Sequence, residues 1–146
     1  MKYFAYGSNM EKSQMVKRCP NFKILGKAKL NGFKLGFSKE SSLWEGGVAD
    51  IAKDLNNHVW GVLYELTEQD LDSLDTYEAC PRYYKRKNIS VEYRSNNFEA
   101  IAYEVVNKES FILPSRKYMN VIIKAAIENH FPKEYIDFLK SIKTNS

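Results

Sequence analysis

The chain has 146 residues, of which 44% are apolar and 27% are charged. This length and balance are typical of one ordinary domain over residues 1–146, and they exclude a disordered or fibrous chain. The formal charge is +4, from 22 basic and 18 acidic residues that recur along the whole chain, so the basic surplus is thinly spread.

Several absences narrow the class further. No apolar run of about 18 residues is present, so we expect no membrane-spanning helix and no membrane partner. The N-terminus lacks an apolar stretch ending in a small-residue cleavage site, which predicts a cytoplasmic protein. Cys19, Cys80, His58 and His130 are isolated in the sequence, so we expect neither a disulfide framework nor a metal site.

The first half of the chain is predicted to be rich in strands. A short apolar strand at residues 2–5 is followed by a break at residues 7–9 and a short helix at about residues 11–18. The dipeptide Asn31-Gly32 lies between two segments that alternate with period two, which predicts a tight type I′ hairpin. The remaining predicted elements of this half are a loop at 44–47, a strand at 48–52, a turn at 54–57 and a central strand at 58–66.

The next elements are a helix and two strands. Thr67 can cap a helix that runs through Leu74, since a threonine hydroxyl accepts a hydrogen bond from a free N–H of the first turn. Two strands follow, at about residues 84–93 and 98–106, and residues 95–97 join them.

The chain is predicted to end in two helices. Ser115 is the expected N-cap of a helix to about residue 129, and Pro132 opens the last one. The longer helix has apolar residues at helical spacing, which predicts a buried face made of Tyr118, Val121, Ile122, Ala125 and Ala126. Strands first, helices last and short connections favour an α+β fold with a compact, mostly antiparallel β-barrel flanked by helices.

The first candidate functional segment is the loop after the first strand, where Tyr6, Gly7, Ser8 and Asn9 follow one another. Glycine permits a positive φ, and successive N–H groups of such a turn can converge on an anion or a developing oxyanion. Most turns of this composition are only turns, so the pattern leaves both interpretations open.

The second candidate segment is the acidic end of the helix that Thr67 begins. Asp72 and Asp75 are three residues apart, and solvation is the usual fate of such side chains. Glu78 differs because it lies between an aromatic residue and Cys80-Pro81, just before a strand. Partial burial there would raise its pKa and suit it to general acid/base catalysis, whereas a surface turn would leave it an ordinary glutamate.

The third segment is the basic and aromatic run at residues 82–87. A nucleic-acid patch can have this composition, and so can a strand with a solvated face of lysine and arginine. We favour the strand face and expect no nucleic-acid partner, because one short cluster is a small electrostatic footprint.

The same residues resemble the γ-glutamylcyclotransferase-like family, which includes γ-glutamylamine cyclotransferases. The resemblance is carried by the N-terminal motif Tyr-Phe-Ala-Tyr-Gly-Ser-Asn-Met at residues 3–10 and by Leu-Asp-Thr-Tyr-Glu at residues 74–78. It extends over nearly the whole chain, through the segments 26–30, 32–37, 44–51, 59–64 and 114–118.

The resemblance implies a site and an activity. Glu78 matches the acid/base of the family, and the matching substrate-holding residues are Tyr3, Tyr6, Gly7, Ser8, Asn9 and Tyr118. Many relatives have glycine where this chain has Ala79, which affects the expected shape of the pocket and the identity of the leaving group. The expected fold is a mixed barrel, and no cofactor is expected.

The implied reaction is cleavage of a γ-glutamyl amide by its own α-amino group, giving 5-oxoproline and a free amine or amino acid. The expected partner is a small γ-glutamyl compound, and the protein is expected to be a monomer or a homodimer. The alternative is a non-catalytic module that binds a γ-glutamyl or similar amino-acid-like ligand.

Overall fold

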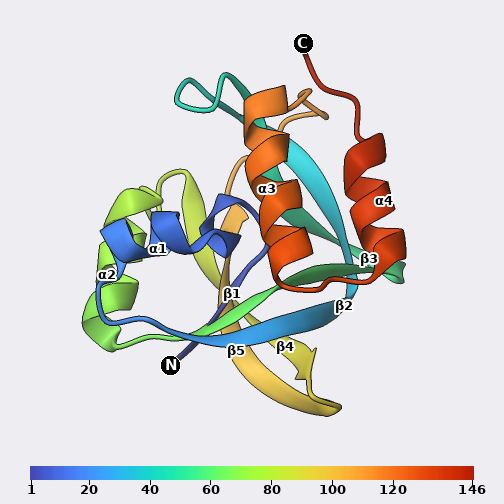
Figure 1. The fold of residues 1–146 in the computed structure, drawn as a ribbon. Helices are drawn as coiled ribbons and strands as arrows, with labels where there is room; N and C mark the ends of the chain where they lie inside the picture. Colours follow the sequence, from blue (N-terminus) through green and yellow to red (C-terminus); the bar gives the residue numbers. More distant parts are fainter.

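The first strand, β1 (Lys2–Ala5), is short and buried, since Tyr3, Phe4 and Ala5 are each less than 5% exposed. The computed structural model describes residues 1–146 and closes five strands into a barrel, in the order β1-β3-β2-β4-β5 (Figure 1). The β1–β5 contact is parallel, and the other strand pairs are antiparallel. The predicted fold class, a mostly antiparallel barrel with flanking helices, is confirmed.

The two longest strands form one continuous hairpin, β2 (Lys23–Ser41) with β3 (Gly46–Glu65). Their turn lies at residues 42–45, so the hairpin predicted at Asn31-Gly32 is wrong. Gly32 does adopt a positive φ of 81°, but at a bend within β2. Opposite it, β3 places four residues, 54–57, against the single residue Gly32. They were predicted as a turn and instead form an irregularity within the strand.

The second hairpin joins β4 (Tyr84–Tyr93) to β5 (Asn96–Val105). Its connecting residues are Arg94 and Ser95, with φ of 49° and 65°, as a two-residue turn of the primed type requires. The strands agree with the prediction, and the connection lies slightly earlier than the expected residues 95–97.

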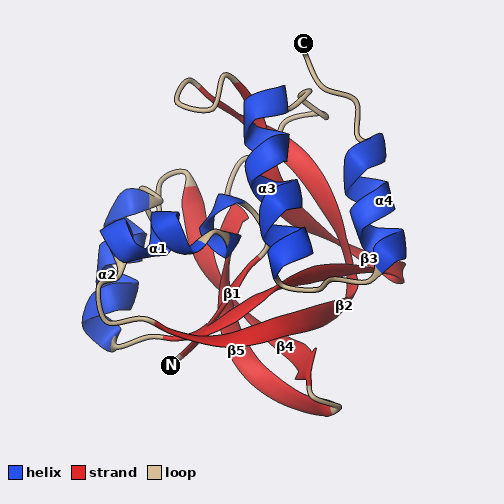
Figure 2. Cartoon of the chain, viewed as in Figure 1, coloured by secondary structure: helices blue, strands red, loops and turns tan.

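The helices lie outside the barrel in two groups (Figure 2). A 3₁₀ turn, η1 (Ser8–Met10), leads into α1 (Lys12–Arg18), which lies beside α2 (Glu68–Tyr77). The other pair is α3 (Arg116–Glu128) and α4 (Lys133–Ser141). No helix is both long enough and apolar enough to cross a membrane.

Both predicted helix caps are confirmed. The Thr67 hydroxyl accepts a hydrogen bond from Asp70 N at 3.1 Å, and the Ser115 hydroxyl accepts one from Tyr118 N at 3.1 Å. These caps set where α2 and α3 begin, and therefore where their ends meet the barrel. Of the predicted buried face of α3, Tyr118, Ile122, Ala125 and Ala126 are buried and Val121 is only partly buried. Met119, which was not predicted, is buried as well.

Candidate active site

A cavity of about 530 Å³ opens beside the end of β1. Its walls come from the loop after β1, the β2–β3 turn, the end of α2, the start of β4 and the first turn of α3. All the residues predicted for the site line this cavity: Tyr3, Tyr6, Gly7, Ser8, Asn9, Glu78 and Tyr118. The fold therefore brings together residues that are up to 115 positions apart in the sequence.

The loop after β1 packs tightly against α3 and β3. A Cβ atom on Gly7 would lie 3.0 Å from the Tyr118 hydroxyl and 3.3 Å from the Ala49 side chain, so glycine lets the loop approach closely. The first backbone hydrogen bond of η1 runs from Met10 N to Gly7 O at 3.1 Å. The backbone N–H groups of Gly7, Ser8 and Asn9 come earlier in the chain than this first bond and donate no backbone hydrogen bond.

The side chain of Asn9 makes hydrogen bonds to other side chains of the protein. Its amide nitrogen donates to the Tyr3 hydroxyl at 2.9 Å, and its oxygen accepts a hydrogen bond from the Arg18 guanidinium. Asn9 is therefore buried at the cavity wall, and its side chain is held in place by these two partners.

Three buried tyrosines, Tyr3, Tyr6 and Tyr118, line the cavity, and their hydroxyls differ in whether they donate or accept a hydrogen bond within the protein. The Tyr6 hydroxyl donates to Tyr103 O. The Tyr3 and Tyr118 hydroxyls accept hydrogen bonds, from Asn9 and from Ala49 N at 2.9 Å, so their own protons remain to be donated. Burial raises the pKa of each of the three well above its usual value, which keeps them neutral.

Tyr118 was predicted both as a buried residue of the helix and as a residue of the site. Its helical spacing predicts a buried residue, and the resemblance implies contact with substrate. The side chain is 3% exposed, and it also lines the cavity, where its ring packs against Trp44 with 5.2 Å between ring centroids.

Glu78 lies at the end of α2, on the cavity wall. Its carboxylate accepts no hydrogen bond or ion pair from the protein, and burial raises its pKa from 4.5 to about 7. The positive charge of Arg18 opposes that rise. A carboxyl group with such a pKa exchanges protons near neutral pH, as a general acid/base requires.

Arg18, at the end of α1, was not singled out from the sequence. Its guanidinium donates to the side chains of Asn9, Gln14 and Tyr77, and it lies 3.5 Å from the centre of the Tyr77 ring. It therefore links the loop after β1 to the residue directly before Glu78. Neither spacing nor composition indicated this role, because one arginine in a short polar helix has no distinctive pattern.

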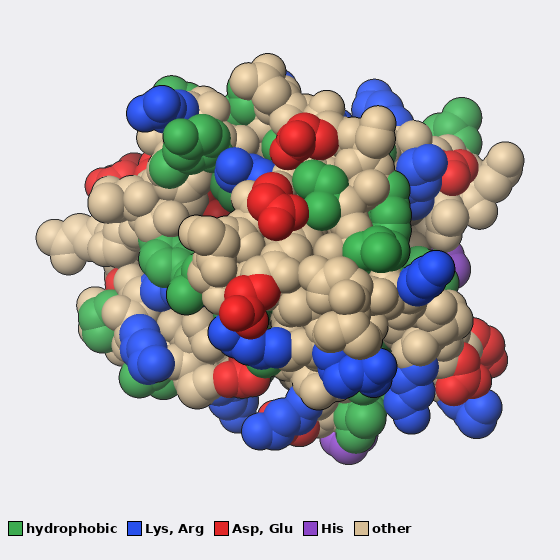
Figure 3. Space-filling model, turned by 90° about the horizontal axis from the view of Figure 1, so that it is seen from above, with side chains coloured by type: hydrophobic (Ala, Val, Ile, Leu, Met, Phe, Trp, Pro, Cys, Tyr) green, Lys and Arg blue, Asp and Glu red, His purple; other side chains and the backbone are tan.

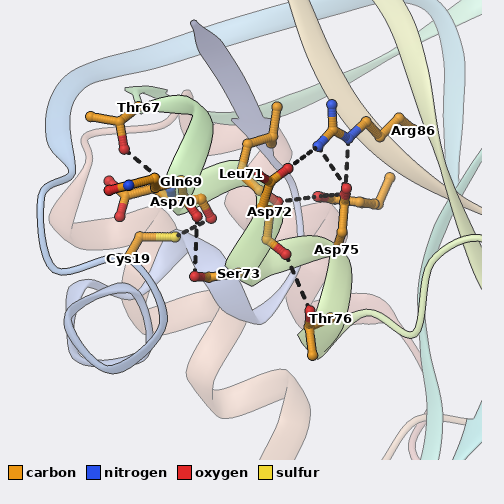
Figure 4. A network of polar contacts seen from close by, with 11 residues as sticks. Cys19, Thr67, Gln69, Asp70, Leu71, Asp72, Ser73, Asp75, Thr76 and Arg86 are labelled. Carbon is orange, nitrogen blue, oxygen red and sulfur yellow. Dashed lines mark hydrogen bonds and ion pairs between the residues drawn. The ribbon is translucent and has the colours of Figure 1, made fainter.

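The acids near the end of α2 have partners on β4. Asp75 accepts two hydrogen bonds from Arg86, at 2.9 and 2.6 Å, and a third from the Tyr103 hydroxyl at 2.5 Å. Asp72 accepts one from Arg86 at 3.3 Å (Figure 4). The expectation of solvation is confirmed for Asp72, whose side chain is 76% exposed, and is wrong for Asp75, which Arg86 and Tyr103 bind.

The basic run at residues 82–87 therefore forms no free patch of positive charge. Arg86 pairs with α2, and both Lys85 and Lys87 lie within 4.0 Å of Glu104 on β5. On the face shown in Figure 3, basic and acidic side chains are interspersed. No group of three or more His, Cys, Asp or Glu side chains is placed to hold a metal ion.

Comparison with known proteins agrees with this architecture. Residues 58–139 match the AIG2-like family. The chain is 35% identical to the γ-glutamylcyclotransferase of Bos taurus and 34% identical to that of Homo sapiens, over 98% of this chain and 79% of each relative. This chain belongs to the γ-glutamylcyclotransferase-like family.

A solved structure of a family member supports the same assignment. A γ-glutamyl cyclotransferase superimposes with a TM-score of 0.94 at 32% identity, over 100% of this chain and 89% of that chain. The backbone at Ala79 suits the glycine that the resemblance implies at this position. Its φ of 51° lies in the left-handed region, which glycine adopts without the steric cost that alanine bears.

Proposed function

We propose that this protein is a γ-glutamylcyclotransferase whose acid/base is Glu78. The observation that carries the proposal is the position of that carboxyl group on a tyrosine-lined cavity, with its pKa raised to about 7. The curated relatives, which cover nearly the whole chain, support the activity. The substrate is a small molecule that contains a γ-glutamyl amide.

The reaction closes a ring within the substrate. Glu78 removes a proton from the α-ammonium group, and the amine nitrogen then attacks the γ-carbonyl carbon. As the ring closes, the attacking nitrogen gives up a second proton, so that the lactam keeps one N–H. The bond from that carbon to the leaving nitrogen breaks, and Glu78 passes protons on to the departing amine. The products are 5-oxoproline and a free amine or amino acid, and a base in this role contributes roughly 10²- to 10⁴-fold to the rate.

The remaining residues select the folded-back substrate. The free N–H groups at Gly7, Ser8 and Asn9 are suited to the substrate carboxylate or to the oxyanion that forms on the γ-carbonyl. Tyr3 and Tyr118 add hydroxyl donors beside this loop, since the Tyr3 hydroxyl accepts from Asn9 and a Cβ on Gly7 would lie 3.0 Å from the Tyr118 hydroxyl. Because the attack is intramolecular, holding the reacting atoms together supplies a large part of the acceleration.

The test is release of 5-oxoproline from γ-glutamyl amino acids and γ-glutamyl amines, with Glu78→Gln beside the unaltered protein. The glutamine keeps the size of the side chain and cannot accept the proton, so we expect kcat to fall by at least about 100-fold while the substrate still binds. Saturable binding without product from either protein would indicate a non-catalytic module. Turnover that survives in the variant would exclude Glu78 as the base.

A further inference from the structure

Lys39 is the only lysine or arginine among the residues that line the cavity. It lies near the end of β2 and is half-buried. Its ammonium group pairs with no carboxylate and lies 4.2 Å from the centre of the Tyr83 ring. A cation held over an aromatic face, without an acidic partner, remains available to an anion that enters the cavity.

The position of Lys39 relative to Glu78 indicates which part of a substrate it meets. Tyr83 belongs to the segment that follows Glu78, and its N–H donates to Ala79 O at 3.0 Å. Lys39 thus reaches from β2 to the wall that carries the acid/base. The leaving nitrogen has to lie within reach of Glu78 to receive its proton, so the leaving group occupies the space beside Tyr83 and Lys39.

The two ends of a γ-glutamyl amino acid carry separate carboxylates. The glutamyl carboxylate has the N–H groups of the loop after β1 as its proposed partners, which are a separate set of donors in the same cavity. The second carboxylate belongs to the departing amino acid, and a simple γ-glutamyl amine lacks it. We propose that Lys39 binds this second carboxylate and makes the enzyme prefer γ-glutamyl amino acids over γ-glutamyl amines.

This inference rests on the proposed cyclotransferase activity, and a matched substrate pair tests it. γ-Glutamylalanine and γ-glutamylethylamine differ only in the carboxylate of the leaving group. In Lys39→Met, which keeps an unbranched side chain without charge, we expect kcat/KM for γ-glutamylalanine to fall by about 10-fold. The loss should appear in KM, because the contact is present before and during the reaction.

The expected value of kcat/KM for γ-glutamylethylamine in Lys39→Met lies within about 2-fold of the unaltered protein, which also shows that the variant is folded. Lys39→Arg should restore most of the preference, and high salt should weaken it in the unaltered protein. Lys34→Met is the matched control, because Lys34 lies on the same strand, is exposed and does not line the cavity.

Each other outcome has a distinct meaning. If Lys39→Met slows both substrates equally, Lys39 acts on the glutamyl part or on the fold, and the inference is overturned while the activity stands. If neither substrate releases 5-oxoproline even with the unaltered protein, the proposed function fails, and the inference fails with it.

Discussion

At the scale of single residues, the pKa of Glu78 depends on two opposing effects, its burial and the charge of Arg18. Burial raises it to about 7, and the positive charge of Arg18 opposes the rise. The titratable groups close to it include the phenols of Tyr3, Tyr6, Tyr84 and Tyr118, which burial keeps neutral. Arg18 is thus the charge that limits how far the pKa of Glu78 rises.

This balance predicts how activity depends on pH. Glu78 has to be ionised to accept a proton, so kcat/KM should fall as the pH drops through about 7. Arg18→Met removes the opposing positive charge, and the midpoint of that fall should move to higher pH. The measurement is kcat/KM for one γ-glutamyl compound between pH 5 and 9.

Gln14→Ala is the control for this prediction. It removes one hydrogen-bond partner of Arg18 at 2.8 Å and leaves the charge in place. We expect it to keep the midpoint of the unaltered protein. If Arg18→Met only lowered the activity at every pH by one factor, the guanidinium would have a structural role and no electrostatic one.

Only part of this site could be predicted from the sequence. The resemblance indicated Glu78 and the residues of the loop after β1, because they lie in contiguous motifs. Lys39 lines the cavity, and Arg18 lies behind its wall against Asn9 and Tyr77. Tertiary contacts place both residues, so no local pattern indicated them. The hydrogen bonds of the Asn9 side-chain amide to Tyr3 and Arg18 could not be predicted either, because both depend on tertiary contacts.

At the scale of elements, the β2–β3 hairpin shows why local turn chemistry misled. Asn31-Gly32 has the composition of a tight turn, and Gly32 does use a positive φ. However, cross-strand pairing with β3 continues on both sides of it, from Asn31 opposite His58 to Phe33 opposite Lys53. Tertiary pairing over nearly 20 residues outweighs one dipeptide, whereas the helix caps are set by neighbours within three residues and were predicted correctly.

Close packing between β1 and β3 gives a prediction for the barrel itself. A Cβ on Gly61 would lie 2.4 Å from Ala5 O and 2.6 Å from the Phe4 ring, so Gly61→Ala should push β1 and the loop that follows it away from β3. We expect the free energy of unfolding to fall by roughly 1–3 kcal/mol, measured by chemical denaturation. KM should rise as well, because the displaced loop forms the cavity wall.

Gly36→Ala is the matched control for that prediction. Gly36 lies on β2, and an added Cβ there meets no atom within 4 Å. We expect its free energy of unfolding to stay within about 0.5 kcal/mol of the unaltered protein. Equal losses in the two variants would show that the contact with β1 is not the cause.

At the scale of the whole molecule, the buried carboxyl group of Glu78 lowers the free energy of unfolding. The pKa of Glu78 is about 7 in the folded protein, against an ordinary value of 4.5. Below about pH 4.5 the group is protonated in both states, so it costs nothing. Between those values the folded state binds more protons than the unfolded state, so this group's effect is a loss of stability as the pH rises, complete above about pH 7.

Glu78→Gln should therefore stabilise the protein and inactivate it together. At pH 8 we expect the free energy of unfolding to rise by about 2 kcal/mol, because the uncharged amide avoids the cost of burying an unpaired charge. At pH 4 the gain should disappear. Chemical denaturation at the two pH values measures it, and Glu99→Gln, an exposed position on β5, should change neither by more than about 0.5 kcal/mol. A gain of equal size at both pH values would mean that better packing, rather than the removal of a buried charge, stabilises the variant.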